Sequence, residues 1–279
     1  MKPRDWIAGI ALIVAAAVGL GVGYLIWGWP TDWYARDVTQ LPANPENDVI
    51  RHGHDLVINT AEQVGKDATD PQTRYAGNDL ACVNCHLNAG LRPFAAPFVS
   101  TFATFPMLVD DQVITLKHRI NGCMQRSLNG KEIPDDSPEM QALIAYIKFL
   151  GQGTPEGVRV AGMGLFPLSD PPMAADATRG EKVYAANCAS CHKDDGQGER
   201  NRAPKVSYSI PPLWGDDSFN EAAGMAKLAY AAAYIRTNMP FGVRDQDPVL
   251  SVQQAWDVAA YMTSKPRPPA PPGAGSDLR

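Results

Sequence analysis

The 279-residue chain has no long basic run, and its formal net charge is −5. A mildly acidic protein without such a run is a poor candidate for binding nucleic acid. Cysteine is scarce and odd in number, at five residues, which argues against a simple disulfide framework. Charged residues make up 20% and hydrophobic residues 45% of the chain, a globular composition. The length fits one large domain or two ordinary ones.

Charge is also absent from the run of 24 residues between Trp6 and Trp29. At about 1.5 Å of rise per residue, a helix of this length spans the ~30 Å hydrocarbon core of a membrane. Two basic residues precede the run and favour a cytoplasmic amino terminus. A signal peptide cleaved near the alanines at 15–17 is the alternative, although the apolar run continues past them. We therefore predict that residues 1–30 form an N-terminal membrane anchor.

Four of the five cysteines belong to two Cys-x-x-Cys-His motifs, at 82–86 and 188–192. This motif attaches haem c, because its thiols bond covalently to the haem and its histidine binds the iron. One copy alone would also fit a redox pair or half a zinc site, but zinc needs paired motifs close together and these lie 106 positions apart. We predict two covalently bound haem c groups, attached through Cys82, Cys85, His86, Cys188, Cys191 and His192. Attachment of haem c outside the bacterial inner membrane agrees with an exported chain at its periplasmic face.

A stretch rich in glycine and proline, residues 151–175, separates two halves that repeat the same order of elements. Its helix- and strand-breaking residues predict a linker. Apolar residues at helical spacing predict helices over 49–64 and 138–150 in the first half, and over 177–187, 221–237 and 252–263 in the second. In the opening helices Gly53 and Gly180 are small, and in the closing helices Tyr146 and Tyr261 are aromatic, a combination that suits a close helix crossing.

The expected fold is all-α, with two tandem class I cytochrome c domains joined by the linker and preceded by one N-terminal transmembrane helix. The predicted boundaries are 1–30 for the anchor, 46–152 for the first domain, 153–175 for the linker, 176–265 for the second domain and 266–279 for a disordered tail.

The second iron needs a sixth ligand, and Met239 is the best candidate in the sequence. It ends an apolar helix and precedes Pro240, an arrangement typical of class I cytochromes. Methionine opposite histidine raises the reduction potential and suits electron transfer. Met225 and Met262 are the alternatives, but both lie inside predicted helices.

The first half offers a different set of residues. The stretch 112–131 contains no acidic residue and several basic ones around the fifth cysteine, Cys123. If the stretch is helical, Arg119, Arg126 and Ser127 share the face of the thiol. Arginine lowers the pKa of a neighbouring thiol, a thiolate can bind haem iron and lower its potential, and arginines can also bind an anion bidentately.

Other interpretations of this stretch stay open. Cys123 can be an inert core residue, and the basic residues can form a solvated face or contact haem propionates. His118 and Met124 are rival ligands within the stretch. His52 and His54 are rival ligands in the opening helix.

The stretches GNDLACVNCHLNAG, RINGCMQRSLNG and AAAYIRTNMPFG resemble the dihaem thiosulfate dehydrogenase / tetrathionate reductase family, roughly over residues 50–265. The middle stretch is far more specific than the haem motifs. The resemblance implies that the first haem is the active site, with His86 and Cys123 as its ligands, and that the second is ligated by His192 and Met239. It also implies substrate contacts from Arg119, Arg126 and Ser127. Asn238 stands where some members have a ligand-exchanging lysine, so no such exchange is expected.

The activity that this resemblance implies joins two thiosulfate dianions into tetrathionate, or the reverse. We hypothesise that Cys123 leaves the iron when the first haem is reduced and then bonds covalently to substrate sulfur as a nucleophile. The cationic cluster would offset the repulsion between the dianions. The expected partners are thiosulfate or tetrathionate, the membrane through the anchor, and a redox partner: a cytochrome, a high-potential iron–sulfur protein or a quinol-linked complex. The alternative is a membrane-anchored dihaem cytochrome c that only carries electrons or serves as an oxidoreductase subunit, which has no need of Cys123 and its arginines.

Overall fold

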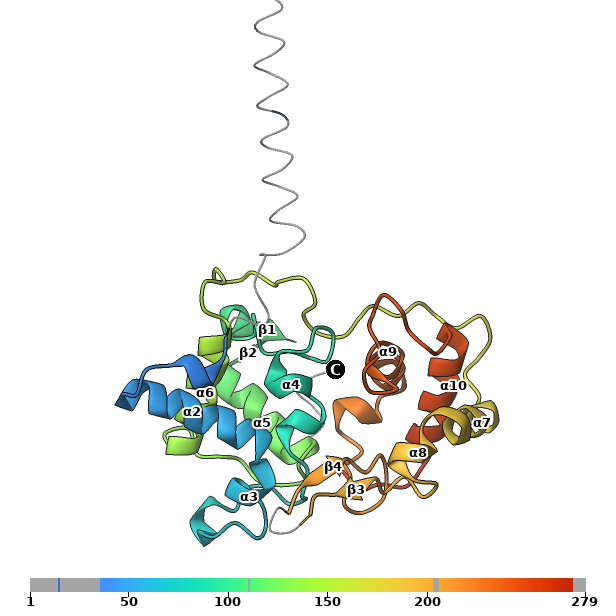
Figure 1. Cartoon of the computed structure of the whole chain (residues 1–279), viewed down its shortest axis with the longest axis horizontal. Coiled ribbons are helices and arrows are strands. Elements are labelled where there is room, and N and C mark those ends of the chain that lie inside the picture. The colour runs from blue at the N-terminus through green and yellow to red at the C-terminus, as the bar shows by residue number, and fades with distance from the viewer. Residues whose placement is uncertain (1–14, 16–35, 110, 203–205, 273–279) are drawn as a thin grey trace, which may run out of the picture.

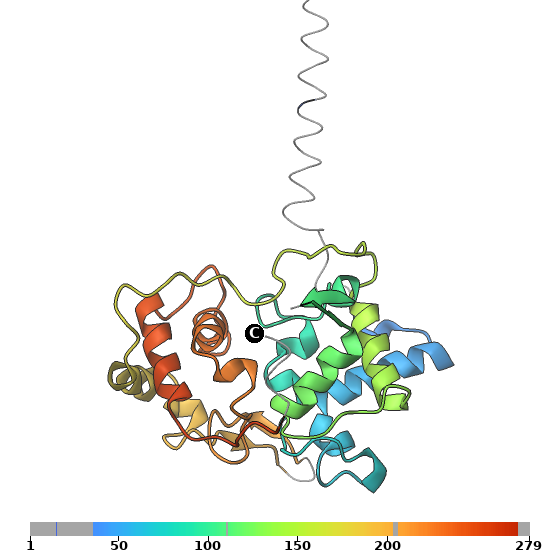
Figure 2. The ribbon, with the colours of Figure 1, turned by 180° about the vertical axis from the view of Figure 1, so that it is seen from behind.

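The computed structural model describes residues 15, 36–109, 111–202 and 206–272. Two helical lobes lie side by side, and the stretch between α6 and α7 runs along one edge from the first lobe to the second (Figures 1 and 2). Within the described part of the chain, none of the helices has the length and apolarity needed to cross a membrane. The anchor predicted at 1–30 lies outside the described residues, apart from Ala15.

The first lobe consists mainly of helices. Its α-helices are α2 (Pro45–Ile58), α3 (Thr60–Val64), α4 (Leu87–Gly90), α5 (Leu116–Arg126) and α6 (Pro138–Leu150). Its 3-10 helices are η1 (Val38–Gln40), η2 (Pro71–Thr73), η3 (Cys82–Asn84) and η4 (Phe102–Thr104). The strands β1 (Met107–Val109) and β2 (Gln112–Ile114) pair as an antiparallel hairpin that leads into α5.

The second lobe repeats the arrangement with fewer elements. Its helices are α7 (Ala177–Asn187), α8 (Ala189–His192), the 3-10 helix η5 (Gly224–Ala226), α9 (Leu228–Asn238) and α10 (Val252–Thr263). The short strands β3 (Glu199–Arg200) and β4 (Tyr208–Ile210) pair in antiparallel fashion between α8 and η5.

In each lobe the opening and closing helices cross at a glycine. A Cβ atom built on Gly53 of α2 would overlap the carbonyl of Ala142 in α6 and would come within 2.7 Å of the Tyr146 Cβ atom. A Cβ atom on Gly180 of α7 would likewise overlap the carbonyl of Asp257 in α10. These contacts confirm the predicted glycine-and-tyrosine helix crossing in both halves.

Three of the predicted helices have the predicted bounds, because each begins at a strong N-cap. Ser137, Asp176 and Ser251 accept a hydrogen bond from a backbone N–H in the first turn of α6, α7 and α10, respectively. A side chain that accepts from these N–H groups satisfies donors that the helix itself leaves unpaired.

Two predicted helices are wrong in their bounds. The helix expected over 49–64 begins earlier, at Pro45, and breaks at Asn59, whose φ of −122° and ψ of 39° are not helical. The helix expected over 221–237 begins only at Leu228, because Lys227 is extended and separates η5 from α9. An apolar pattern continues across such a break, so the spacing of residues alone does not reveal it.

The tail predicted as disordered over 266–279 is ordered at its start. The Gly215 N–H donates to the Pro266 carbonyl at 2.9 Å, and the Glu221 N–H donates to the Pro268 carbonyl at 3.1 Å. The Arg267 guanidinium lies 4.6 Å from the centre of the Phe219 ring. The prediction is therefore wrong for these residues, and residues 273–279 lie outside the described part.

The two lobes are packed against each other. Arg200 of the second lobe donates to Asp79 of the first at 2.7 Å and to Asp217 of its own lobe at 2.8 Å. Phe219, Ala223 and the partly buried Met225 belong to the same hydrophobic cluster as the core of the first lobe. One continuous apolar core therefore reaches from the first lobe into the second.

The glycine crossing can be tested with Gly180→Ala. We expect a loss of about 1–3 kcal/mol or more in the free energy of unfolding, since the added methyl meets a backbone carbonyl that cannot rotate away. Denaturant unfolding of the haem-loaded chain measures it. The matched control is Gly224→Ala, where the nearest atom lies 3.7 Å from the new Cβ, an ordinary contact. Equal stability of the two variants would contradict the interpretation.

Candidate functional site

The first Cys-x-x-Cys-His motif forms a tight turn after α3. The Cys85 and His86 N–H groups donate to the Cys82 carbonyl at 3.2 and 2.9 Å. The Cys82 N–H donates to the Thr60 hydroxyl at 3.0 Å, and that hydroxyl donates to the Leu56 carbonyl at 2.7 Å. Burial raises the pKa of Cys82 to about 11 and that of Cys85 to about 12. The turn thus gathers two partly buried thiols and one imidazole, the donor set for a covalently attached haem.

Both motif histidines are oriented by a backbone carbonyl. His86 Nδ1 lies 2.6 Å from the Ala96 carbonyl, and His192 Nδ1 lies 2.9 Å from the Pro211 carbonyl. A carbonyl oxygen only accepts, so each Nδ1 carries the proton and each Nε2 keeps a lone pair for a metal. Metal-ligating histidines in proteins use this arrangement, which fixes the tautomer and the ring orientation. Both sites therefore fit a haem iron.

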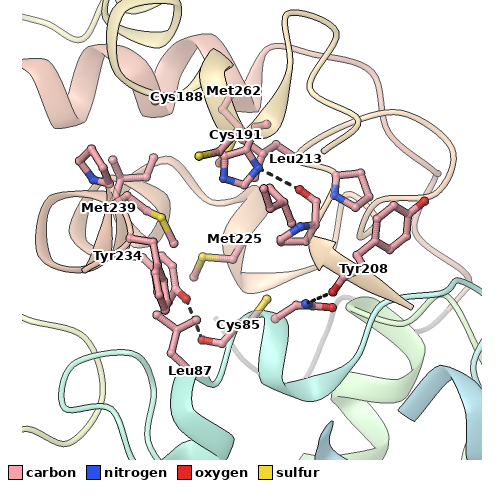
Figure 3. A pocket seen from close by; sticks show the side chains of 18 of the residues that line it. Cys85, Leu87, Cys188, Cys191, Tyr208, Leu213, Met225, Tyr234, Met239 and Met262 are labelled. Carbon is pink, nitrogen blue, oxygen red and sulfur yellow. Dashed lines mark hydrogen bonds between the residues drawn. The ribbon is translucent and has the colours of Figure 1, made fainter. Parts of the chain in front are cut away.

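The second motif opens onto a cavity of about 490 Å³ between the lobes. Its lining is largely apolar and includes Cys188, Cys191, His192 and Met239. Figure 3 shows the Met239 side chain directed into this space, with Met225 and Met262 also on its walls. A cavity of this size, apolar with a few convergent polar groups, suits a cofactor. The residues that the sequence predicted for the second haem are thus brought together.

Helix α5 carries the fifth cysteine to the first motif. The Thr115 side chain caps the helix by accepting from the His118 N–H at 3.1 Å, and the helix ends at Arg126. The Ser127 N–H donates to the Cys123 carbonyl, four residues earlier, at 2.8 Å. The conditional prediction that this stretch is helical is therefore confirmed for Leu116–Arg126, whereas Gln112–Ile114 form the strand β2 and residues 127–131 follow the end of the helix.

Cys123 faces His86 across the site. Burial alone would raise the pKa of this thiol, but the Arg119 guanidinium, a hydrogen bond with His86 and the Arg126 guanidinium lower the pKa to about 6. The charge of Cys123 in turn helps to raise the pKa of Cys82 and of Cys85, which shows that the three thiols lie close together. A thiol with such a pKa exists largely as thiolate at neutral pH.

Three of the rival ligands in the first lobe, Met124, His54 and His118, lie elsewhere. Met124 is 2% exposed and belongs to the hydrophobic core. His54 packs edge-on against the Tyr146 ring at 5.4 Å between centroids, and burial lowers its pKa. His118 is exposed in the first turn of α5. Cys123 is the sequence-predicted candidate that meets His86.

Gly122 makes room for one of the two arginines. A Cβ atom on Gly122 would overlap the guanidinium of Arg126, which is itself only 8% exposed. The glycine thus allows a buried cation to lie back along α5 beside the thiol. A glycine inside a helix is less favourable than alanine by about 1 kcal/mol. At position 122 the space that the glycine leaves is filled by the Arg126 guanidinium of the cationic cluster.

Sequence reasoning missed the groups that orient the histidines. Every residue carries a backbone carbonyl, so nothing in the residue types at 96 or 211 marks them as partners of a histidine. It also missed the contacts from α9 to the first lobe, where the Tyr234 hydroxyl donates to the Cys85 carbonyl at 2.9 Å. No short motif relates positions this far apart in the chain.

Comparison with known proteins agrees with this geometry. Residues 177–265 match the family model "Cytochrome c", and residues 72–155 match "SoxA/TsdA, cytochrome c domain". The chain is 36% identical over 233 residues to a thiosulfate dehydrogenase of Stutzerimonas stutzeri, covering 83% of this chain and 71% of that protein. It is 38% identical over 238 residues to one of Thiomonas intermedia, covering 85% and 71%.

A solved structure is also similar. The thiosulfate dehydrogenase TsdBA of Marichromatium purpuratum, in its as-isolated form, aligns with a TM-score of 0.74 and 35% sequence identity. The alignment covers 85% of this chain and 50% of that one, so the present chain spans half of the solved protein.

Haem content distinguishes the attachment cysteines from the fifth one. The double variant Cys188→Ala, Cys191→Ala is expected to lose one of two covalent haems, because no thiol remains to hold it. The absorbance of the denatured protein at the haem c bands should fall by about half per chain. The control Cys123→Ala should keep both haems, and loss of a covalent haem from this control would contradict the assignment.

Proposed function

Since the chain belongs to the thiosulfate dehydrogenase family, enzymes with two covalently bound haem c groups, we propose that it oxidises two thiosulfate dianions to one tetrathionate dianion with release of two electrons. The observation that carries the proposal is the position of Cys123 against His86, with Arg119 and Arg126 beside it. The same contacts serve tetrathionate reduction, in which the two electrons enter instead of leaving.

Electrostatic repulsion is the first obstacle to this reaction. Two unit charges 4 Å apart in water interact with about 1 kcal/mol, so two dianions at that distance repel each other by about 4 kcal/mol. Arg119 and Arg126 supply two positive charges at the thiol within a chain of net charge −5. The planar guanidinium matches oxyanions bidentately, and we assign both arginines to the sulfonate oxygens of thiosulfate. We assign Ser127, one turn beyond Cys123, as a neutral hydrogen-bonding contact of the substrate.

We infer that His86 and Cys123 would hold the haem iron in the first lobe and that His192 and Met239 would hold the iron in the second. The haems, when bound, accept the two electrons, and a thiolate ligand lowers the reduction potential while a methionine raises it. Met239 is favoured over Met225 and Met262 because it follows the last turn of α9, where its N–H donates to the Ile235 carbonyl at 2.9 Å. Once free of the iron, the Cys123 thiolate would bond to the outer sulfur of one thiosulfate as two electrons leave for the haem groups. A second thiosulfate would then attack that sulfur, which releases tetrathionate and restores the thiolate.

We also propose a location and an electron acceptor for the protein. The 24 uncharged residues from Trp6 to Trp29 support a single-pass anchor at the periplasmic face of the inner membrane. Arg36, where the described chain resumes, donates through Nε to the Phe149 carbonyl at the end of α6. A cytochrome, a high-potential iron–sulfur protein or a quinol-linked complex then accepts electrons from the second lobe.

Replacing Cys123 by alanine tests the function. We expect thiosulfate-dependent reduction of an electron acceptor to fall by at least 100-fold, because the nucleophile is lost while both haems stay attached. The matched control is Gln125→Ala on the same helix, whose side chain donates to the exposed Glu132 carboxylate at 3.3 Å. Wild-type turnover by the Cys123 variant would refute the assignment of this site.

Gly122→Ala tests the arginine cluster without removing a charge. The added methyl group should displace the Arg126 guanidinium, so we expect the KM for thiosulfate to rise several-fold. Stability should not fall, because alanine is favoured over glycine within a helix by about 1 kcal/mol. Arg126→Lys should raise the KM in the same way, since the planar fork is lost. An unchanged KM in both variants would exclude Arg126 from substrate binding.

A further inference from the structure

One face of α9 reaches from the second lobe into the first. Tyr234 and Asn238 are four residues apart and therefore lie on the same face of the helix. Both are buried, with exposed fractions of 7% and 1%. The Tyr234 hydroxyl donates to the Cys85 carbonyl at 2.9 Å (Figure 3), and the Asn238 Nδ2 donates to the Phe94 carbonyl at 3.1 Å. The helix that delivers Met239 to the second haem site thus also touches the first haem site.

The segment that Asn238 contacts is the one that orients His86. Its residue Ala96 supplies the carbonyl that lies 2.6 Å from His86 Nδ1. Phe94 and Ala96 have φ values of 58° and 49°, the left-handed region that residues with a side chain rarely adopt. Such conformations cost on the order of 1–3 kcal/mol each and persist only where the surroundings enforce them.

Two sets of contacts enforce this conformation. From the linker, the Gly162 carbonyl accepts from the Phe94 N–H at 2.7 Å, and the Gly164 carbonyl accepts from the Ala96 N–H at 3.0 Å. From α9, Asn238 holds the Phe94 carbonyl. The segment is therefore fixed through its N–H groups by the linker and through a carbonyl by the second lobe.

Asn238 is a polar side chain in a buried position, and its hydrogen bonds explain why an amide lies there. Within the described residues, its Oδ1 atom is buried and has no hydrogen-bond partner. An unsatisfied buried acceptor costs about 1–3 kcal/mol, so an apolar side chain would be cheaper at this position. The bonds that Nδ2 makes to the Phe94 and Tyr234 carbonyls must offset that cost.

We propose that Tyr234 and Asn238 are positioning residues that couple the two haem sites through α9. They hold the attachment turn at Cys85 and the segment at Ala96, and thereby keep His86 in its ligating orientation. This inference rests on the assignment of His86 as an axial ligand in the proposed function. A histidine whose Nδ1–H donates to a carbonyl is a more basic ligand and stabilises oxidised iron, so loosening that bond raises the potential.

The test uses the haem-loaded full chain without thiosulfate. Tyr234→Phe removes a single oxygen atom, and Asn238→Ala removes the bond to Phe94. In both variants we expect the midpoint potential of the first haem to rise in a spectroelectrochemical titration, and its low-temperature EPR signal to shift or broaden. The absorption band of the methionine-ligated second haem should be retained.

The control is Arg200→Ala, which removes the bond between Arg200 and Asp79 and loosens the lobe interface without touching Cys85 or the 94–96 segment. Its first-haem potential and EPR signal should match those of the wild type. Unchanged values in both test variants would overturn the proposal, as would an equal shift in the control. The proposed function fails separately, if Cys123→Ala retains turnover, because potentials and EPR are recorded without substrate.

Discussion

Both lobes depend on a contact in which one helix backbone rests directly on another. Gly53 on α2 and Gly180 on α7 each lie against a backbone carbonyl of the closing helix, where a Cβ atom would not fit. This close approach lets the tyrosine of the closing helix pack beside the crossing. In the first lobe, the Tyr146 hydroxyl then donates to the Ala89 carbonyl at 2.8 Å, just after the haem motif. The crossing thereby sets the position of the turn that carries the cysteines and the histidine.

The chemistry at Cys123 results from opposing electrostatic effects within one helix. Burial disfavours a thiolate, whereas the guanidinium groups one turn away on either side and His86 favour it, and the combined effect of these groups is larger than that of burial. An acidic protein can hold an anionic substrate only if its positive charges are gathered locally. Helix α5 does this with a capped start, a glycine beside the thiol and no acidic residue along its length.

The sequence predicted those parts of the molecule that depend on local chemistry. The helices at 138–150 and 252–263 were predictable because a capping serine coincides with the start of an apolar pattern. The break at Lys227 was not, because it depends on how the preceding segment packs into the other lobe. In the site, the motif cysteines and histidines can be identified from their spacing in the sequence. The carbonyl that orients His86 does not, since its role comes from a left-handed backbone and not from a side chain.

The stretch between the lobes was expected to be a mere linker, yet it pairs with the first lobe at Ala95 and Leu165. Part of the support for the carbonyl behind His86 therefore comes from residues that follow the first cytochrome domain in the chain. A fragment cut after α6 would contain both ligands proposed for its haem and still lack the linker contacts that fix the segment behind His86. The two halves repeat the same order of helices, but the first half also needs contacts from the linker. The part of the chain that supports the first haem site therefore ends inside the linker and not at the end of α6.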